Sequence, residues 1–400
     1  MASRELPNPA ELARYQLRRD LDRFEGQRRL LLHKRDRMAV SPFSFLRGTA
    51  PLFYEALRRA PWLAAGPKGK GWLVGDLHLE NFGAYRPEPL GTEGSSPRVV
   101  FDVNDFDDAF IGPQLLDVLR LLTSTVLASR DWGLSSAASV STAEVVLEGM
   151  LAGRRLGRAG RCPSSVRELL ERVADRSRRE LLDQRTRRMS GGRRFQRGPR
   201  YRSLTARQRQ QALVAFTAYA KSLPKEHRAH PEAWEVRDVA FRVAGTGSLG
   251  ALRIAVLVAG KGGIDGGWLF DMKEEGLPAG RSFAERARSH GAQRVRAALT
   301  KCPAAPPSMV GVTELGQRSM LVRRLTPQED RLALPDLAAA ERESALFFLG
   351  ALAGALHHRA AKDAPQWRAR KARRLVENAV TLAGLHEAAA VHYAMLAAEI

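Results

Sequence analysis

The chain has very little cysteine and no long apolar run. Only two of its 400 residues are cysteine, Cys162 and Cys302, and they lie far apart. Two such cysteines exclude a disulfide framework and give no zinc-ligand spacing, which favours a reducing compartment. The longest apolar helical run, SALFFLGALAGAL, is too short to span a bilayer, and the first residues are polar and charged. We therefore expect a soluble, cytoplasmic protein without a membrane span.

Acidic residues are scarce relative to basic ones. The chain has 64 Lys and Arg against 43 Asp and Glu, which gives a formal net charge of +21. This excess favours an anionic partner, although Arg enrichment can equally reflect genomic base composition and a solvated surface. The charge comes with no helix-turn-helix, zinc-finger or RNA-binding signature, so nucleic-acid binding is not favoured.

The acidic residues that are present concentrate between Gly75 and Asp117, in GDLHLENFGAY and VVFDVNDFDDAFIGPQLLD. The runs FGAY and RVVFDV predict a β-hairpin that is closed by the Pro- and Gly-rich PEPLGTEGSSP. Burying several carboxylates together is costly unless a cation or a proton offsets their charge. We therefore predict that a divalent metal ion binds at this hairpin.

The spacing of three of these residues is typical of phosphoryl transfer. Asp76 and Asn81 lie on one short loop, and Asp105 follows the hairpin. In phosphoryl-transfer enzymes such a first Asp orients the attacking hydroxyl, and the Asn and the second Asp hold Mg²⁺ on the nucleotide phosphates.

The segments GDLHLENFG and NDFDDAFIGPQLLD resemble the catalytic and metal motifs of the aminoglycoside-phosphotransferase branch of the protein-kinase-like superfamily. Together with SPFSFLRGTA upstream, they resemble the uncharacterised bacterial DUF2252 family more closely still. One departure is that the His that usually precedes GD in those kinases is Val74 here.

The resemblance implies a role for each matching residue. Asp76 corresponds to the catalytic aspartate, and Asp117 to a buried aspartate that braces the catalytic loop. The metal ligands would be Asn81, Asp105 and Asp107, with Asp107 and Asp108 as candidates for a second metal or for substrate. Further candidates for contacts with substrate or phosphate are Arg47, His78 and Asp108.

A second informative region begins near Trp234, where a strand, a glycine-rich turn and two further strands follow one another, the last strand carrying Lys273. This is the order of a kinase small lobe, whereas a Rossmann unit needs a helix straight after the glycines. Backbone N–H groups would approach the ATP phosphates at Gly245, Gly247, Ser248 and Gly250. Lys273 would hold the α- and β-phosphates.

The carboxylate partner of Lys273 is expected in the next helix. Glu285 is the first candidate, and the alternative is that Gln293 and Arg294 of the segment GAQRV supply the contact. The sequence does not decide between them.

Length and element order predict a two-lobed α+β fold of the protein-kinase-like type. Because the catalytic loop precedes the glycine-rich loop, we expect this fold to be circularly permuted, with a mostly helical large lobe. The predicted parts are an N-terminal helical segment (1–70), a large lobe with the catalytic and metal loops (71–232), a small β-rich nucleotide-binding lobe with the hinge (233–326), and C-terminal helices of the large lobe (327–400).

The function predicted from these features is an ATP- and Mg²⁺-dependent phosphotransferase with an unidentified hydroxyl-bearing acceptor. A metal-dependent phosphoesterase is an alternative, although the chain has no GNH-like motif. A non-catalytic pseudokinase, or a basic binder that uses the Arg-rich segment 154–209, is another. We interpret that segment as a mobile, solvated loop. His357 and His358 are interpreted as a cap or a packed surface pair outside the site.

Overall fold

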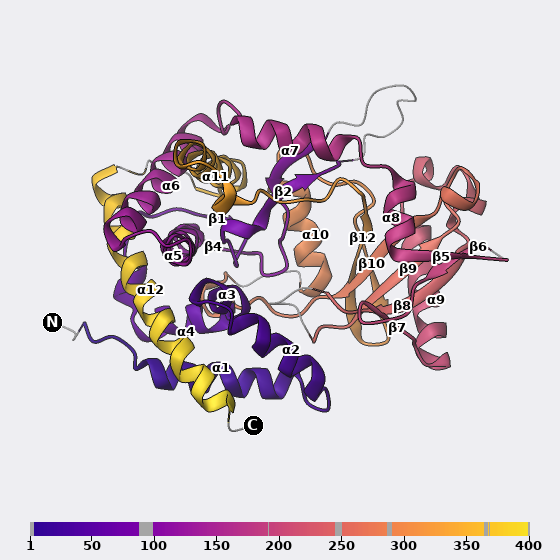
Figure 1. The fold of residues 1–400 in the computed structure, drawn as a ribbon, viewed down its shortest axis with the longest axis horizontal. Helices are drawn as coiled ribbons and strands as arrows, with labels where there is room; N and C mark the ends of the chain where they lie inside the picture. The colour runs from indigo at the N-terminus through magenta and orange to yellow at the C-terminus, as the bar shows by residue number, and fades with distance from the viewer. Residues whose placement is uncertain are drawn as a thin grey trace.

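The computed structural model describes residues 4–87, 99–190, 192–244, 250–285, 290–363, 367 and 369–398. Helices gather at one end of the molecule and a β-sheet lies at the other (Figure 1). The predicted α+β class is confirmed. Within the described residues, no helix combines the length and the apolar character needed to cross a membrane. Cys162 and Cys302 are both free thiols, as expected.

The chain begins with four helices, α1 (Pro9–Arg23), α2 (Arg28–Met38), α3 (Pro42–Gly48) and α4 (Ala50–Arg59). Helix α1 begins at Pro9 because the Asn8 side chain accepts a hydrogen bond from the N–H of Ala10 at 2.9 Å and Pro9 occupies the first turn. Helix α1 packs along the last helix, α12 (Ala369–Ala398), where the Tyr393 hydroxyl donates to Asp20 at 2.8 Å.

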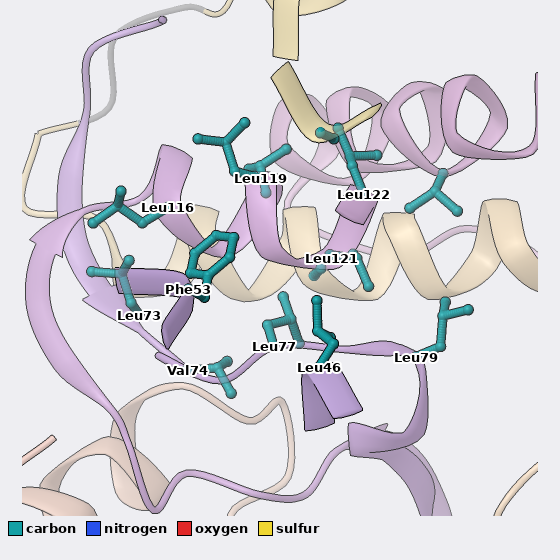
Figure 2. Packing of buried hydrophobic residues seen from close by; sticks show 14 of the residues in the cluster. Leu46, Phe53, Leu73, Val74, Leu77, Leu79, Leu116, Leu119, Leu121 and Leu122 are labelled. Atoms are coloured by element: carbon teal, nitrogen blue, oxygen red, sulfur yellow. The ribbon is translucent and has the colours of Figure 1, made fainter. Parts of the chain in front are cut away.

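The helical part has its centre at α5 (Leu115–Asp131), which is buried over nearly its whole length. Around it lie α6 (Ser136–Leu156), α11 (Ala339–Ala360) and α12. Figure 2 shows leucines of α5 next to Leu73, Val74 and Leu77, together with Leu46 and Phe53 of the N-terminal helices. This apolar core anchors the loop that carries Asp76.

Two short strand pairs frame that loop. Strand β1 (Lys70–Leu73) pairs with β4 (Phe110–Pro113), and β2 (Phe82–Tyr85) pairs with β3 (Val100–Val103), both antiparallel. The predicted hairpin between FGAY and RVVFDV is therefore confirmed. Most of its connecting segment, 88–98, lies outside the described residues.

Among the described residues, the large sheet has six antiparallel strands in the order β11-β12-β10-β9-β8-β7. Along the chain these are β7 (Tyr201–Arg202), β8 (Val236–Arg242), β9 (Arg253–Val258), β10 (Trp268–Glu274), β11 (Gly311–Leu315) and β12 (Arg318–Leu325). Helix α9 (Ala206–Ser222) covers one face through Phe216 and Tyr219. Helix α10 (Gly291–Lys301) packs against β11 and β12, between the sheet and the helical part (Figure 1). Short 3₁₀ turns lie at Pro61–Ala64, Leu79–Asn81, Lys225–Arg228, Pro231–Trp234, Gly263–Asp265, Arg281–Phe283 and Leu334–Asp336.

The interpretation of the Arg-rich segment 154–209 as a mobile loop is wrong for its described residues. The segment forms α7 (Ser164–Ala174), α8 (Arg178–Arg185) and the hairpin of β5 (Thr186–Met189) with β6 (Gly192–Phe195). Carboxylates offset its charge: the buried Arg193 guanidinium donates to Asp183 and Asp265, each at 2.6 Å. Arginines that are paired in this way stabilise an ordered segment.

Helices α6 and α11 touch backbone to backbone through glycines. A Cβ atom added at Gly149 or Gly153 would lie 2.0 Å from a carbonyl oxygen of α11, and one added at Gly350 or Gly354 would lie 2.1 Å from a carbonyl oxygen of α6. Each pair of glycines is four positions apart, so both lie on one face of their helix. The approach of the two helices requires these residues to be glycine.

Gly153→Ala should lower the free energy of unfolding by about 2 kcal/mol, because overpacking outweighs the roughly 1 kcal/mol that Ala gains from helix propensity. The matched control is Gly384→Ala in α12, where an added Cβ has no atom within 4 Å. That substitution should stabilise the protein by about 0.5–1 kcal/mol. Urea denaturation of both variants measures the difference. Equal effects of the two substitutions would contradict the close helix packing.

Candidate functional site

The loop after β1 is held by a buried carboxylate. Asp117, at the start of α5, accepts hydrogen bonds from the N–H groups of Val74 at 2.7 Å and Gly75 at 2.9 Å. The buried His357 of α11 places Nε2 3.0 Å from the same carboxylate. The expected bracing role of Asp117 is thus seen in the geometry. The interpretation of His357 as a cap or surface residue is wrong, because this imidazole is fully buried against Asp117. His358 instead places Nδ1 2.9 Å from the Arg154 carbonyl oxygen.

Gly75 brings two loops into direct contact. Its φ of +85° favours glycine, and an added Cβ would lie 1.9 Å from the carbonyl oxygen of Asp108. The Tyr54 hydroxyl donates to the Gly75 carbonyl oxygen at 2.5 Å. The loop that carries Asp76 and the loop after the hairpin are therefore locked against each other.

Asp76 lies beside a fully buried guanidinium. Arg120 of α5 donates from Nε to Asp76 Oδ1 at 2.5 Å and from a terminal nitrogen to the Leu46 carbonyl oxygen at 2.9 Å. Burial raises the pKa of Asp76 to about 7, even though Arg120 acts to lower it. Near neutral pH this carboxyl group therefore exchanges a proton easily, as a general base must.

His78 and Asn81 close the turn that follows. The Asn81 side-chain oxygen accepts the N–H of His78 at 2.7 Å, and His78 Nδ1 accepts the N–H of Glu80 at 3.2 Å. Burial lowers the pKa of His78 well below its ordinary value, so the imidazole is neutral. Both side chains line the cleft, and these contacts fix the loop.

Arg47 shares a carboxylate with a second arginine. It lies 2.7 Å from a carboxylate oxygen of Glu80, and Arg331 donates to the same oxygen at 2.6 Å. The charge of Arg47 is thus partly offset by Glu80, at the rim of the cleft that holds Asp76.

The loop after the hairpin meets the sheet at Lys273. This buried lysine of β10 forms an ion pair with Asp107 and lies 3.2 Å from Glu275 Oε1. Asp108 accepts the N–H of Ala279 at 2.6 Å. Arg294 of α10 donates to the carbonyl oxygen of Asp107 at 2.8 Å. The sheet, α10 and the hairpin loop therefore converge on one point.

The predicted Lys273–Glu285 pair is wrong. Glu285 lies 2.6 Å from Lys362 and 3.4 Å from Lys70, and it does not line the cleft. The reason is that Glu285 precedes α10, which begins at Gly291, and its N–H is tied to the Ile111 carbonyl oxygen at 2.8 Å. Glu275 takes the place expected for Glu285. Its position two residues after Lys273, just past the end of β10, is the signal that could have found it.

The alternative partner for Lys273 is not borne out either. Arg294 donates to backbone carbonyl oxygens, those of Ala109, Asp107 and Gly276. Gln293 does not line the cleft.

A cleft of about 1230 Å³ lies between the sheet and the helical part. It collects nine of the predicted site residues, namely Arg47, Asp76, His78, Asn81, Asp105, Asp107, Asp108, Gly250 and Lys273. Gly250 has a φ of +92° and lies against the Phe24 ring. Gly245, Gly247 and Ser248 lie outside the described residues. Sequence reasoning missed Arg120 and Glu275, and it named Arg294 and His357 without the contacts that they make here.

The oxygen donors in the cleft would hold a metal ion only together with further oxygens that a bound ligand supplies. Among residues that the structure describes, no three His, Cys, Asp or Glu side chains are grouped to hold an ion. The Asn81 oxygen accepts a backbone N–H, and Asp107 is paired with Lys273. Mg²⁺ is commonly held by one or two protein oxygens together with phosphate oxygens and water. Asn81 and Asp105 both line the cleft and carry side-chain oxygens of this kind.

Asp117→Ala should lower the free energy of unfolding by about 3 kcal/mol or more, because it leaves the N–H groups of Val74 and Gly75 without their acceptor in a buried position. Chemical denaturation checks this value. The control is Asp175→Ala, which removes an exposed aspartate outside the cleft and should change little. A loss below about 1 kcal/mol for Asp117→Ala would contradict the bracing role.

Comparison with known proteins gives a family. The family model described as "Uncharacterized protein conserved in bacteria (DUF2252)" matches residues 26–152 and 157–397. No curated protein and no solved structure matches the chain. The matched residues make up most of the chain and include Asp76, Asp105 and Lys273. The family expected from the sequence is confirmed, and the chain belongs to the bacterial DUF2252 family.

Proposed function

We propose that this protein is an ATP- and Mg²⁺-dependent phosphotransferase that acts on a hydroxyl-bearing acceptor. The observation that carries the proposal is the ion pair between Lys273 of the sheet and Asp107 of the hairpin loop. It brings two regions that are far apart in sequence, each with a phosphoryl-transfer pattern, to one cleft. A phosphate chain held by Lys273 would then lie beside Asp105 and Asp107.

In the proposed reaction each group in the cleft has one task. Lys273 donates hydrogen bonds to the phosphates, and Glu275 orients the lysine. Asn81 and Asp105 would hold Mg²⁺, which supplies neutralisation of the phosphate charge. Asp76 accepts the proton of the attacking hydroxyl, and Arg120 fixes the position of its carboxylate. Rate acceleration by this arrangement comes from positioning and electrostatics.

The proposal includes a two-lobed kinase-like arrangement in permuted order. Its support is the order of elements: β8, β9 and β10 precede α10, β11 and β12, as in a kinase small lobe. The Asp76 and Asp105 loops, which would follow those elements in a kinase, precede them here. Residues 322–325 of β12 would form the hinge, and α5, α6 and α11 would belong to the large lobe.

Isothermal titration of ATP with Mg²⁺ tests the nucleotide site. Wild type and Asp76→Asn should bind, whereas Asp105→Asn should bind at least tenfold more weakly because a metal ligand is lost. Lys273→Gln should also weaken binding, because it removes the positive charge that attracts the phosphates. The substitution keeps a hydrogen-bond donor next to Glu275, so the charge is what it tests. Asp175→Asn is the matched control, as an exposed aspartate outside the cleft.

Release of γ-phosphate, measured in the same samples, separates binding from chemistry. Asp76→Asn should bind ATP and release no phosphate above background. Binding without turnover in the wild type over long incubation would favour the pseudokinase alternative. Failure of the wild type to bind ATP with any divalent ion would overturn the proposed function.

The rate of phosphate release should depend on the ionisation of Asp76. The pKa of this carboxyl group is raised from 3.8 to about 7, so its base form disappears as pH falls below 7. The rate should drop about tenfold per pH unit there and level off above about pH 8. A pH–rate profile from about pH 5.5 to 8.5 checks this. A flat profile would contradict the role of Asp76 as the base.

A further inference from the structure

The cleft-facing side of the large sheet carries charge where strands usually carry apolar side chains. Asp271 and Lys273 lie two residues apart on β10 and therefore on one face. Arg323 of β12 is directly opposite Asp271, and Arg253 of β9 is directly opposite Lys273. Arg242 ends β8, and all five side chains line the cleft.

The apolar remainder of this face is closed. Ala240, Leu257 and Leu269 are buried in one cluster with Leu182 of α8 and Phe195 of β6. Helix α8 and the β5–β6 hairpin thus cover that part of the sheet. The part that stays open to the cleft is the charged part.

One carboxylate is surrounded by three guanidinium groups. Asp271 Oδ2 lies 2.6 Å from Arg253 and 2.9 Å from Arg242, and the carboxylate is only 1% exposed. The arginines hold the pKa of Asp271 well below its usual range, and Arg323 contributes to this. Within the described part of the chain, Asp271 Oδ1 and the Arg242 Nε have no hydrogen-bond partner.

The arginines of this cluster are unequally compensated: Asp105 and Glu275 act on Arg253 besides Asp271, whereas Arg242 and Arg323 have fewer carboxylates near them. Glu329 lies 3.9 Å from Arg323, at the limit of an ion pair. Asp271 is the one carboxylate paired with Arg242 among the described residues. Like charges held together in a partly buried wall are unfavourable unless an anion offsets them. Arginine also presents a planar fork that matches phosphate oxygens.

We propose that Arg242, Arg253 and Arg323 form a phosphate-binding subsite, oriented by Asp271. Two residues of a strand span roughly 7 Å, so a chain of two or three phosphates reaches from Lys273 to these arginines. The subsite therefore takes polyphosphate-bearing ligands. It does not depend on the proposed transfer reaction, because phosphate binding requires neither Asp76 nor a metal.

Titration of tripolyphosphate without metal into the full chain tests the subsite. Arg242→Gln should weaken binding about tenfold or more, because it removes a charged donor. The control is Arg237→Gln, which removes the same charge from the same strand at an arginine paired with Glu235 outside the cleft. That variant should bind like the wild type. Equal affinity of Arg242→Gln and wild type would overturn the subsite.

Arg323→Gln provides a second arm on another strand, and urea denaturation reports whether each variant is folded. Arg323→Gln should also bind tripolyphosphate more weakly than the wild type. An unchanged affinity of this variant, once it is shown to be folded, would likewise overturn the subsite. The result is separable from the proposed function. Tripolyphosphate binding without ATP turnover supports the subsite and contradicts phosphotransfer. ATP turnover together with an unchanged affinity of Arg242→Gln for tripolyphosphate supports phosphotransfer and contradicts the subsite.

Discussion

The site depends on the hydrogen bonds that the Asp117 carboxylate accepts from two backbone N–H groups. These bonds fix Val74 and Gly75 at the end of β1, and His357 ties the same carboxylate to α11. Because Gly75 then touches the carbonyl oxygen of Asp108, the loop after the hairpin is positioned by the loop that carries Asp76. A buried ionised group is stable only when such partners replace water, so the apolar core around α5 and this polar brace support each other.

Compensation of charge organises the rest of the cleft. Asp76 is paired with Arg120, Glu80 with Arg47 and Arg331, and Asp107 with Lys273. These basic residues thus have a structural use besides any attraction of anionic partners. In the 154–209 segment, the buried Arg193 is likewise paired with Asp183 and Asp265, which ties α8, the β5–β6 hairpin and the turn before β10 together.

Sequence reasoning located what short motifs and strand patterns encode. The hairpin, the strands of the sheet and the acidic loops follow from local residue order, and the structure brings Asp76, Asp105 and Lys273 to one cleft as expected. It failed where partners are decided by packing between distant elements. Glu285 was expected beside Lys273 on a kinase analogy, but the later start of α10 leaves it with Lys362. Arg120 and His357 belong to helices whose patterns show only burial.

The pairing of Lys273 with Asp107 links the two halves of the proposed site. A phosphate that binds Lys273 must compete with the Asp107 carboxylate, which then becomes available as an oxygen donor beside Asp105. Glu275, buried just past the end of β10, lies 3.2 Å from the lysine on its other side. On the proposed function, metal binding and phosphate binding are therefore coupled, since each makes room for the other. On that proposal, phosphate binding would complete a donor set that, among the described residues, is not grouped around a metal position.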